Sequence, residues 1–176
     1  MQTRLRQYWA LNANPDNYRI EDAAAQLEFD NWVTKGSEIH EGDRAIIWKA
    51  KGHSKTSGIV ALAEIIADPG IAPDLHPEYQ QYASPPHHPG PLEEMVTLRY
   101  FQASHLPLWL DGPYHDFLSS LSIVRGGARR SVYRIEPDQW MAILEAAGGW
   151  PDEESDVQAV ETKVAVHEQR LSSGGI

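Results

Sequence analysis

Cysteine is absent from the 176 residues, and no apolar run approaches the ~18 residues of a membrane-spanning helix. The first absence excludes a disulfide scaffold, a cysteine-ligated metal or iron–sulfur site and a thiol nucleophile. The second, together with an N-terminal segment that lacks the apolar stretch of a signal peptide, predicts a soluble, cytoplasmic protein with no membrane partner.

Basic residues are scarce relative to acidic ones, because 15 Lys and Arg against 25 Asp and Glu give a net charge of −10 at pH 7. Bulk charge therefore excludes nucleic-acid binding over the whole surface, whereas a local basic face stays compatible with it. Hydrophobic residues at 41% and charged residues at 23% are typical of a globular chain. The length fits one domain, or one domain with an appendage.

Catalytic signatures are also missing from the sequence. It contains no nucleophile elbow, no Walker-type phosphate loop, no His-Glu-x-x-His and no Gly-x-Gly-x-x-Gly. Three histidines lie in the segment 68–91, but adjacent histidines in such a loop rarely ligate one ion, so we expect neither a metal nor a cofactor. A small nucleotide-directed enzyme using Glu64 or Asp43 with a histidine stays an alternative, although both acids flank strand ends, where turn and register roles are the default.

Hydrophobic periodicity gives the order of the expected elements. It predicts strands at 6–13, 44–50, 59–67, 94–101 and 131–135, and helices starting at Ile20 and covering 114–121 and 137–147. The resulting order, β-α-β-β-β-α-β-α, has hairpins in place of a regular β-α alternation. We therefore expect an α+β fold, a small mixed or antiparallel β-barrel flanked by helices, and not a doubly wound sheet.

Two segments fall outside these elements. Residues 68–91 contain seven prolines and read as a long loop of the kind that ordered domains keep for function or motion. Residues 149–176 contain six acids and two bases, and 157–171 carry apolar residues at helical spacing. We expect a domain at 1–148 and an acidic linker or tail at 149–176, either the start of a connection to another domain or a docking helix.

Positive charge is concentrated in two islands. The residues expected to contact phosphate are Arg44, Lys49, Lys51 and Lys55 in the first island and Arg125, Arg129 and Arg130, next to Arg134, in the second. Neither 44–63 nor 125–134 contains an acid. Such clusters in an acidic protein are typical of a phosphate-contacting face, because Lys and Arg gain affinity by displacing counterions. Solvated hairpin and loop tips are the alternative.

Tryptophan is frequent, with six in the chain. Trp9 and Trp48 lie inside predicted strands and Trp140 in an amphipathic helix, so core packing explains them. Trp32 differs, because it follows the first helix and has polar residues on both sides. From a loop position beside a basic hairpin, its ring can stack on a flipped or unpaired base. A half-buried core position is the alternative.

Taken in order, several segments resemble the EVE domain, a member of the PUA-like superfamily and a relative of the YTH domain. They are YWALNANPDNYRIED (8–22), NW (31–32), GDRAIIWK (42–49), GIVALAEI (58–65) and RSVYRI (130–135), followed by Trp140. The resemblance covers residues 5 to about 147. Each motif is short, and their order and spacing make the combination specific.

The resemblance implies a PUA-like barrel, without enzymatic activity of its own, whose pocket holds one modified nucleobase. Prokaryotic EVE domains often lie beside or within modification-dependent restriction systems, where they read modified cytosine in DNA. The implied partners are DNA with modified bases, 5-modified cytosine first, and a nuclease partner or fused domain of a defence system. The alternatives are an RNA-binding PUA-like domain, a reader of N6-methyladenine, and an interaction protein that uses the tail as its contact surface.

The resemblance also assigns residues. By motif position, Trp32 matches the first tryptophan of the aromatic cage, and Val33 and Thr34 match the residues whose backbone lines the base edge. Asn14 matches the polar residue after the first strand that bonds the base.

Further candidates complete this expected pocket. Trp48 falls on an aromatic position of the second strand of the motif, and Tyr79 and Tyr82 are candidates for the second cage aromatic. Asn12-Ala13 stands where the family usually has Lys-Ser, which bears on the identity of the base.

Overall fold

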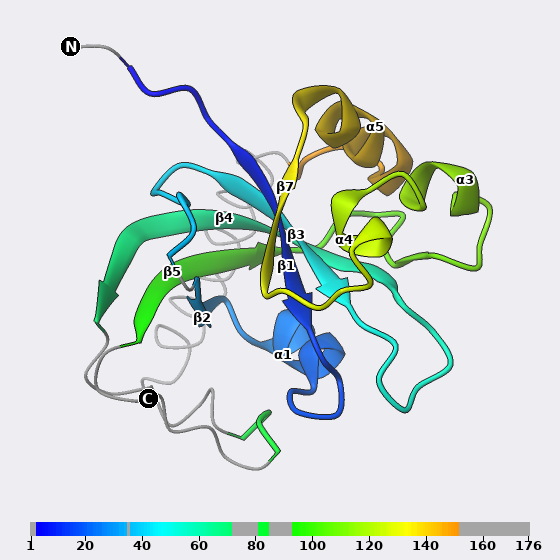
Figure 1. Ribbon diagram of the computed structural model, residues 1–176, viewed down its shortest axis with the longest axis horizontal. Coiled ribbons are helices and arrows are strands. Elements are labelled where there is room, and N and C mark those ends of the chain that lie inside the picture. Colours follow the sequence, from blue (N-terminus) through cyan, green and yellow to red (C-terminus); the bar gives the residue numbers. More distant parts are fainter. Residues whose placement is uncertain (1–2, 35, 72–80, 85–92, 152–176) are drawn as a thin grey trace, which may run out of the picture.

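The computed structural model describes residues 3–34, 36–71, 81–84 and 93–151, which form one curled sheet with helices packed on it (Figure 1). The strands are β1 (Tyr8–Ala13), β2 (Phe29–Val33), β3 (Arg44–Lys49), β4 (Gly58–Ile71), β5 (Glu94–Phe101), β6 (Leu108–Trp109) and β7 (Val132–Ile135). The helices are α1 (Ile20–Gln26), α3 (His115–Leu118), α4 (Ser122–Arg125) and α5 (Pro137–Ala147).

The sheet is mixed. Its strand order among the described residues is β2-β5-β4-β3-β1-β7, with β6 paired to β4. β1 runs parallel to β3, and the remaining pairs are antiparallel. β4 and β5 form the long curved ribbon in Figure 1, where register irregularities between Ile65 and Gly70 allow β4 to bend.

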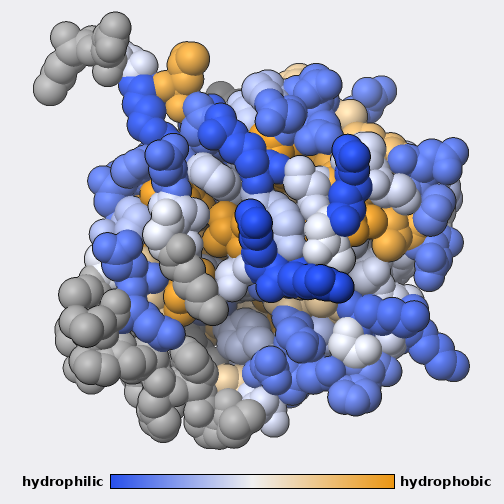
Figure 2. Space-filling view, in the orientation of Figure 1, coloured by the Kyte–Doolittle hydropathy of each residue, from blue (hydrophilic) through white to orange (hydrophobic). Residues whose placement is uncertain are grey.

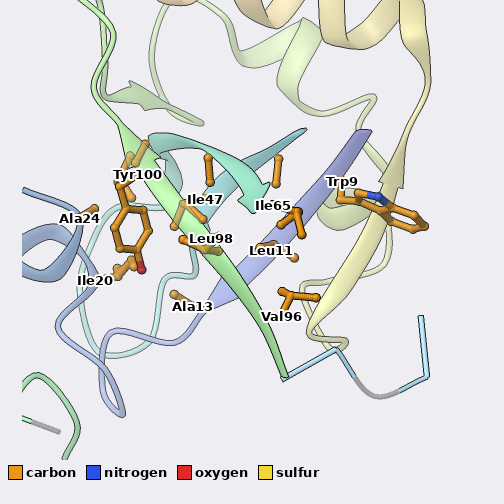
Figure 3. Packing of buried hydrophobic residues seen from close by; sticks show 14 of the residues in the cluster. Trp9, Leu11, Ala13, Ile20, Ala24, Ile47, Ile65, Val96, Leu98 and Tyr100 are labelled. Carbon is orange, nitrogen blue, oxygen red and sulfur yellow. The ribbon is translucent and has the colours of Figure 1, made fainter. Parts of the chain in front are cut away.

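Two hydrophobic clusters lie on opposite faces of the sheet, because neighbouring residues of a strand point to opposite sides. In β3, Ala45 and Ile47 belong to the first cluster, whereas Ile46 and Trp48 belong to the second. The first cluster fills the concave interior, where side chains of β1, β4 and β5 converge and Tyr100 lies beside α1 (Figure 3). The second cluster packs under α3, α4 and α5.

Helix α5 shows how the sequence sets its own boundaries. Pro137 occupies the first turn, and the Glu136 and Gln139 side chains form a reciprocal capping box. Gly148 ends the helix with a φ of +93°, a left-handed conformation that glycine adopts without strain. The buried ring of Trp140 stacks on Tyr8 with ring centroids 4.7 Å apart, which fixes the helix against β1.

The expected α+β barrel flanked by helices is confirmed. The predicted strands and the helices at Ile20 and 137–147 match the structure within a few residues, and β4 continues to Ile71. Three elements were not predicted, namely β2, β6 and α4. None of the helices in the described part of the chain has the length and apolar character needed to cross a bilayer. Most of the predicted 68–91 loop and the tail helix predicted at 157–171 lie outside the described residues.

Candidate nucleic-acid interface

Trp32 lies in β2, the strand at one edge of the sheet, with a half-buried side chain. Its indole packs partly against the first hydrophobic cluster, and its Nε1–H donates to the Tyr100 hydroxyl at 3.1 Å. Within the described residues, no aromatic ring or cation lies against the faces of this indole. The edge of the ring is therefore held, while its faces have no such partner.

The rings of the other five tryptophans are either buried or in contact with a cation or another ring. Trp9, Trp48 and Trp140 are buried, with at most 6% of their surface exposed. Trp109 has the Lys49 ammonium 5.4 Å from its ring centroid. Trp150 lies under the Arg44 guanidinium, at 3.9 Å, and against the rings of Phe101 and Trp140.

The loop position predicted for Trp32 is wrong, because the residue lies in a five-residue strand. β2 pairs antiparallel with β5, with Trp32 opposite Val96. The strand gives a weak sequence signal, because the inward residue before Trp32 is the buried acid Asp30 and the outward Phe29 is exposed. A half-buried strand normally has apolar residues facing inward and polar residues facing outward, and at these two positions the order is reversed.

Asp30 is the centre of a buried polar network. Its Oδ2 accepts hydrogen bonds from the hydroxyls of Tyr18 and Tyr100, both at 2.6 Å, and its Oδ1 accepts the Asn31 N–H at 2.8 Å. Desolvation raises the pKa of Asp30 above its ordinary value, against the three hydrogen bonds that favour the charged form. Burial is the main cause that raises the pKa of Tyr100 well above its ordinary value, and the charge of Asp30 is the next. The Tyr100 hydroxyl is therefore protonated and a donor at neutral pH.

The backbone register places the peptide groups of Val33 and Thr34 differently. The Thr34 N–H bonds the Glu94 carbonyl across to β5 at 3.3 Å, and Val33 is opposite Met95. In an antiparallel pair successive residues alternate in direction, so the N–H and C=O of Val33 point away from β5, toward the sheet edge. Thr34 is 2% exposed, and its hydroxyl has no hydrogen-bond partner among the described residues.

Asn14 opens the turn that links β1 to α1. Its Oδ1 accepts the Asp16 N–H at 3.0 Å, and its carbonyl accepts the N–H groups of Asn17 and Tyr18. The same turn contains Tyr18, whose hydroxyl donates to Asp30. It therefore connects Asn14 to the hydrogen-bond network that ends on Trp32. The side chain of Asn14 is exposed, and the turn leaves its amide nitrogen without a bond within the part of the chain described here.

The remaining aromatic candidates for the pocket differ in where they lie. Tyr82 is 3% exposed, meets Tyr18 edge-on with centroids 6.2 Å apart, and donates to Gln26 Oε1 at 2.6 Å. It therefore lies beside the Asp30 network, but most of its ring is covered. Tyr79 lies outside the described residues. The assignment of Trp48 to the pocket is corrected, because its ring is 2% exposed and belongs to the second cluster, on the opposite face of the sheet from Trp32.

The loops that carry the exposed members of the two basic islands lie at the C-terminal end of β1. On one side, Asp16 accepts the His53 N–H and contacts the His53 ring at 2.7 Å, which ties the loop with Lys51 and Lys55 to the β1–α1 turn. On the other side, the Asn12 side chain donates to the carbonyls of Ala128 and Arg130. Exposed basic residues thus flank the strand that leads to Asn14: Lys51, Lys55, Arg125, Arg129 and Arg130. Figure 2 shows strongly hydrophilic side chains at the centre of this face, over β1 and β7.

The family model described as the EVE domain matches residues 7–146. The chain belongs to the EVE domain family. The resemblance inferred from the sequence motifs is confirmed, and the barrel is of the PUA-like type.

Solved structures agree with this fold. A protein from Pseudomonas putida matches with a TM-score of 0.56 and 22% identity, over 80% of this chain and 99% of that one. The DUF55 domain of human thymocyte nuclear protein 1 matches with a TM-score of 0.53 and 18% identity, over 78% and 96% of the two chains. Human THYN1 in complex with DNA containing 5-methylcytosine gives a TM-score of 0.50 and 16% identity, over 82% and 99%. Comparison with curated proteins gives no match.

Two members of the first basic island have internal roles in this EVE domain. Lys49 is 4% exposed, and its ammonium donates to the Ser54 hydroxyl and to the carbonyl and hydroxyl of Thr56. Arg44 is partly buried between Glu64, at 3.4 Å, and the Trp150 ring. The expectation that Lys49 contacts phosphate is corrected, because its ammonium is buried and bonded to residues of the hairpin loop. Arg44 likewise has its guanidinium engaged.

The acids weighed for an enzyme have structural partners in the EVE domain. Asp43 is buried and bonded to Arg4, Trp9 and two backbone N–H groups, while Glu64 pairs with Arg44. Within the described ranges, no group of three or more His, Asp or Glu is arranged to hold a metal ion. The geometry of these two acids therefore offers no support for the nucleotide-directed enzyme.

Proposed function

We propose that this EVE domain is a binding module that recognises a modified nucleobase, 5-modified cytosine in DNA, flipped out of the duplex onto Trp32. The observation that carries the proposal is the state of this indole. It is half-buried, held at its edge by Tyr100, and has no aromatic or cationic partner on its faces among the described residues. An indole held in this way is a stacking surface whose position is fixed before the base arrives.

The energetics fit a flipped base. Extruding a nucleotide costs a few kcal/mol of unstacking, and stacking on an aromatic side chain returns about 1–3 kcal/mol per base. Hydrogen bonds to the base edge supply the remainder. The edge-facing peptide of Val33 and the amide of Asn14 are the candidates for these bonds.

Cytosine modified at C5 is our choice of base because human THYN1, which shares the fold, is described in complex with DNA containing 5-methylcytosine. A single methyl group in a fitted pocket adds only about 1–3 kcal/mol, so one domain discriminates modestly. A nuclease partner or fused domain would raise the selectivity by acting only when both parts are engaged. We therefore place the protein as the reader component of a cytoplasmic restriction or defence system.

The test of the proposed function is a binding panel. Matched duplexes carry cytosine, 5-methylcytosine, 5-hydroxymethylcytosine or N6-methyladenine at one position, and single-stranded RNA of the same sequence is added. We expect tighter binding to a 5-modified cytosine duplex, and DNA that stays intact after incubation. Preference for RNA would favour the RNA-binding alternative, and cleavage by the purified chain would overturn the non-enzymatic role.

Removing exposed charge should weaken the salt dependence of binding. Each phosphate contact contributes about 0.9 to the slope of log affinity against log salt concentration. The double substitution Lys51→Gln and Lys55→Gln should therefore lower that slope by about 2, and so should Arg129→Gln with Arg130→Gln. The measurement is affinity for one duplex at several salt concentrations.

The control for this experiment is Arg6→Gln. Arg6 is exposed and precedes β1, at the end of the strand opposite the two basic loops. Its removal should leave the slope unchanged. A slope that does not respond to either double substitution would show that these loops do not contact phosphate.

A further inference from the structure

We propose that Asp30 is a positioning residue that acts through the Tyr100 hydroxyl to fix the Trp32 indole and through the Tyr18 hydroxyl to hold the β1–α1 turn beside it. This inference rests on the proposed function, because it assigns residues that prepare the same site. The family resemblance points to Trp32 and Asn14, and the side chains behind them come from the structure alone.

The geometry is a continuous chain of hydrogen bonds. The Trp32 Nε1–H donates to Tyr100 at 3.1 Å, and Tyr100 donates to Asp30 Oδ2 at 2.6 Å. Tyr18 donates to that same oxygen at 2.6 Å. Bonds of this length between a hydroxyl and a carboxylate are typical of the charge-assisted kind, which hold their partners more firmly than neutral bonds do.

The network joins segments that the proposed site needs in register. Trp32 comes from β2, Tyr100 from β5, and Tyr18 from the turn that Asn14 opens. Tyr18 also meets Tyr82 edge-on, which extends the network to residues 81–84. A single carboxylate oxygen therefore sets the spacing between the stacking surface and the turn.

Core stability is a poor explanation for this arrangement. Asp30 is 2% exposed, and a buried carboxylate stays charged only when hydrogen bonds replace its water. Desolvation still raises its pKa. Apolar residues of similar size often stabilise such a position as well as an ionic one. The network carries this penalty and ends on a half-buried indole that has no aromatic or cationic partner on its faces among the described residues, and positioning of that indole explains it.

The test compares Tyr100→Phe with Tyr8→Phe. Both remove one hydroxyl and keep the ring, and Tyr8 stacks on Trp140 outside the network. The first readout is the set of six indole N–H signals in a proton–nitrogen NMR spectrum, with the Trp32 signal identified by its loss in Trp32→Phe. The second readout is the ratio of affinities for the modified and the plain duplex.

We expect Tyr100→Phe to move the Trp32 indole signal and to lower the affinity ratio roughly five- to tenfold, the effect of losing the one hydrogen bond that holds the indole. Tyr8→Phe should change neither. Asp30→Asn, which keeps the shape but loses one acceptor, should act in the same direction. In a Trp32→Phe background, which lacks the indole N–H, Tyr100→Phe should have no further effect on the ratio.

Two outcomes would overturn the inference. An unmoved Trp32 signal in Tyr100→Phe would show that the hydroxyl does not position the indole. A moved signal with an unchanged ratio, accompanied by a lower melting temperature, would assign the network to stability. If the wild-type protein prefers no modified base, the proposed function fails, while the indole signal of the free protein still decides whether Tyr100 positions Trp32.

Discussion

Trp32→Ala should abolish the preference for modified DNA and leave plain DNA binding in place. The indole stacks on a base only when that base has been flipped, and this contact is worth about 1–3 kcal/mol, or roughly 5- to 150-fold in affinity. The exposed lysines and arginines at the end of β1 are untouched by the change. The measurement is the affinity of wild type and variant for duplexes with and without the modification, at one salt concentration.

The same substitution has a cost in stability that must be separated from its effect on binding. Replacing a fully buried tryptophan by alanine costs about 3–5 kcal/mol, and Trp32 is only half-buried, so we expect a smaller loss of about 2–3 kcal/mol. Trp32→Phe keeps an aromatic face and should retain part of the preference. Trp109→Ala is the matched control, because Trp109 is also half-buried against the first cluster but has Lys49 beside its ring.

Trp109→Ala should lower the melting temperature and keep the ratio of affinities. If Trp32→Ala behaves in the same way, Trp32 is a core residue and the proposed pocket is wrong. The two variants therefore separate a packing role from a stacking role in one pair of measurements.

Much of the fold is readable from the sequence because local signals agree with the tertiary structure. β3 and β4 are apolar and partly β-branched, and α5 carries its own proline start and glycine stop. β2 has no comparable signal, since its inward positions hold a carboxylate and a half-buried tryptophan. Its pairing with β5, more than 60 residues away in the chain, defines it as a strand.

The candidate site could be predicted only as a set of residue types. The motifs give Trp32 and Asn14 but no signal for Asp30, because an isolated acid in a polar segment is indistinguishable from a solvated one. Lys49 and Lys51 are two residues apart in the sequence, yet Lys49, the last residue of β3, is buried with its ammonium bonded to Ser54 and Thr56, whereas Lys51 lies beyond the strand and is exposed. Burial here depends on where the strand ends and how the following loop folds back, which charge counting does not contain.

The second large effect is expected at Asp43, where substitution should destabilise the fold and spare recognition. This carboxylate is fully buried just before β3 and accepts hydrogen bonds from Nη1 and Nη2 of Arg4, from the Trp9 indole N–H and from the backbone N–H groups of Gln7 and His40. Asp43→Ala leaves these donors without an acceptor and should cost about 3–5 kcal/mol. In a domain of this size the melting temperature should fall on the order of 10 °C.

The pH dependence gives an independent check on the same residue. Burial by itself would raise the pKa of Asp43, but the hydrogen bonds from Arg4, Gln7, Trp9 and His40 outweigh it and lower the pKa below its ordinary value. In the unfolded chain the pKa returns to about 3.9. The stabilisation is therefore present above that value and is lost as the pH falls toward the lower folded pKa. The melting temperature of Asp43→Ala should accordingly fall less between pH 7 and pH 3 than that of the wild type.

Asp111→Ala is the control, because Asp111 is exposed and an exposed substitution usually changes stability by no more than about 0.5 kcal/mol. Asp43 bonds Trp9 directly, and Asp30 reaches Trp32 through Tyr100, so the two carboxylates hold different indoles. Asp43→Ala measured below its melting temperature should therefore keep the wild-type ratio of affinities for modified and plain DNA. A ratio that collapses in folded Asp43→Ala, with the Trp32 indole signal unmoved, would mean that recognition depends on the Asp43 end of the barrel and not on the indole held by Asp30.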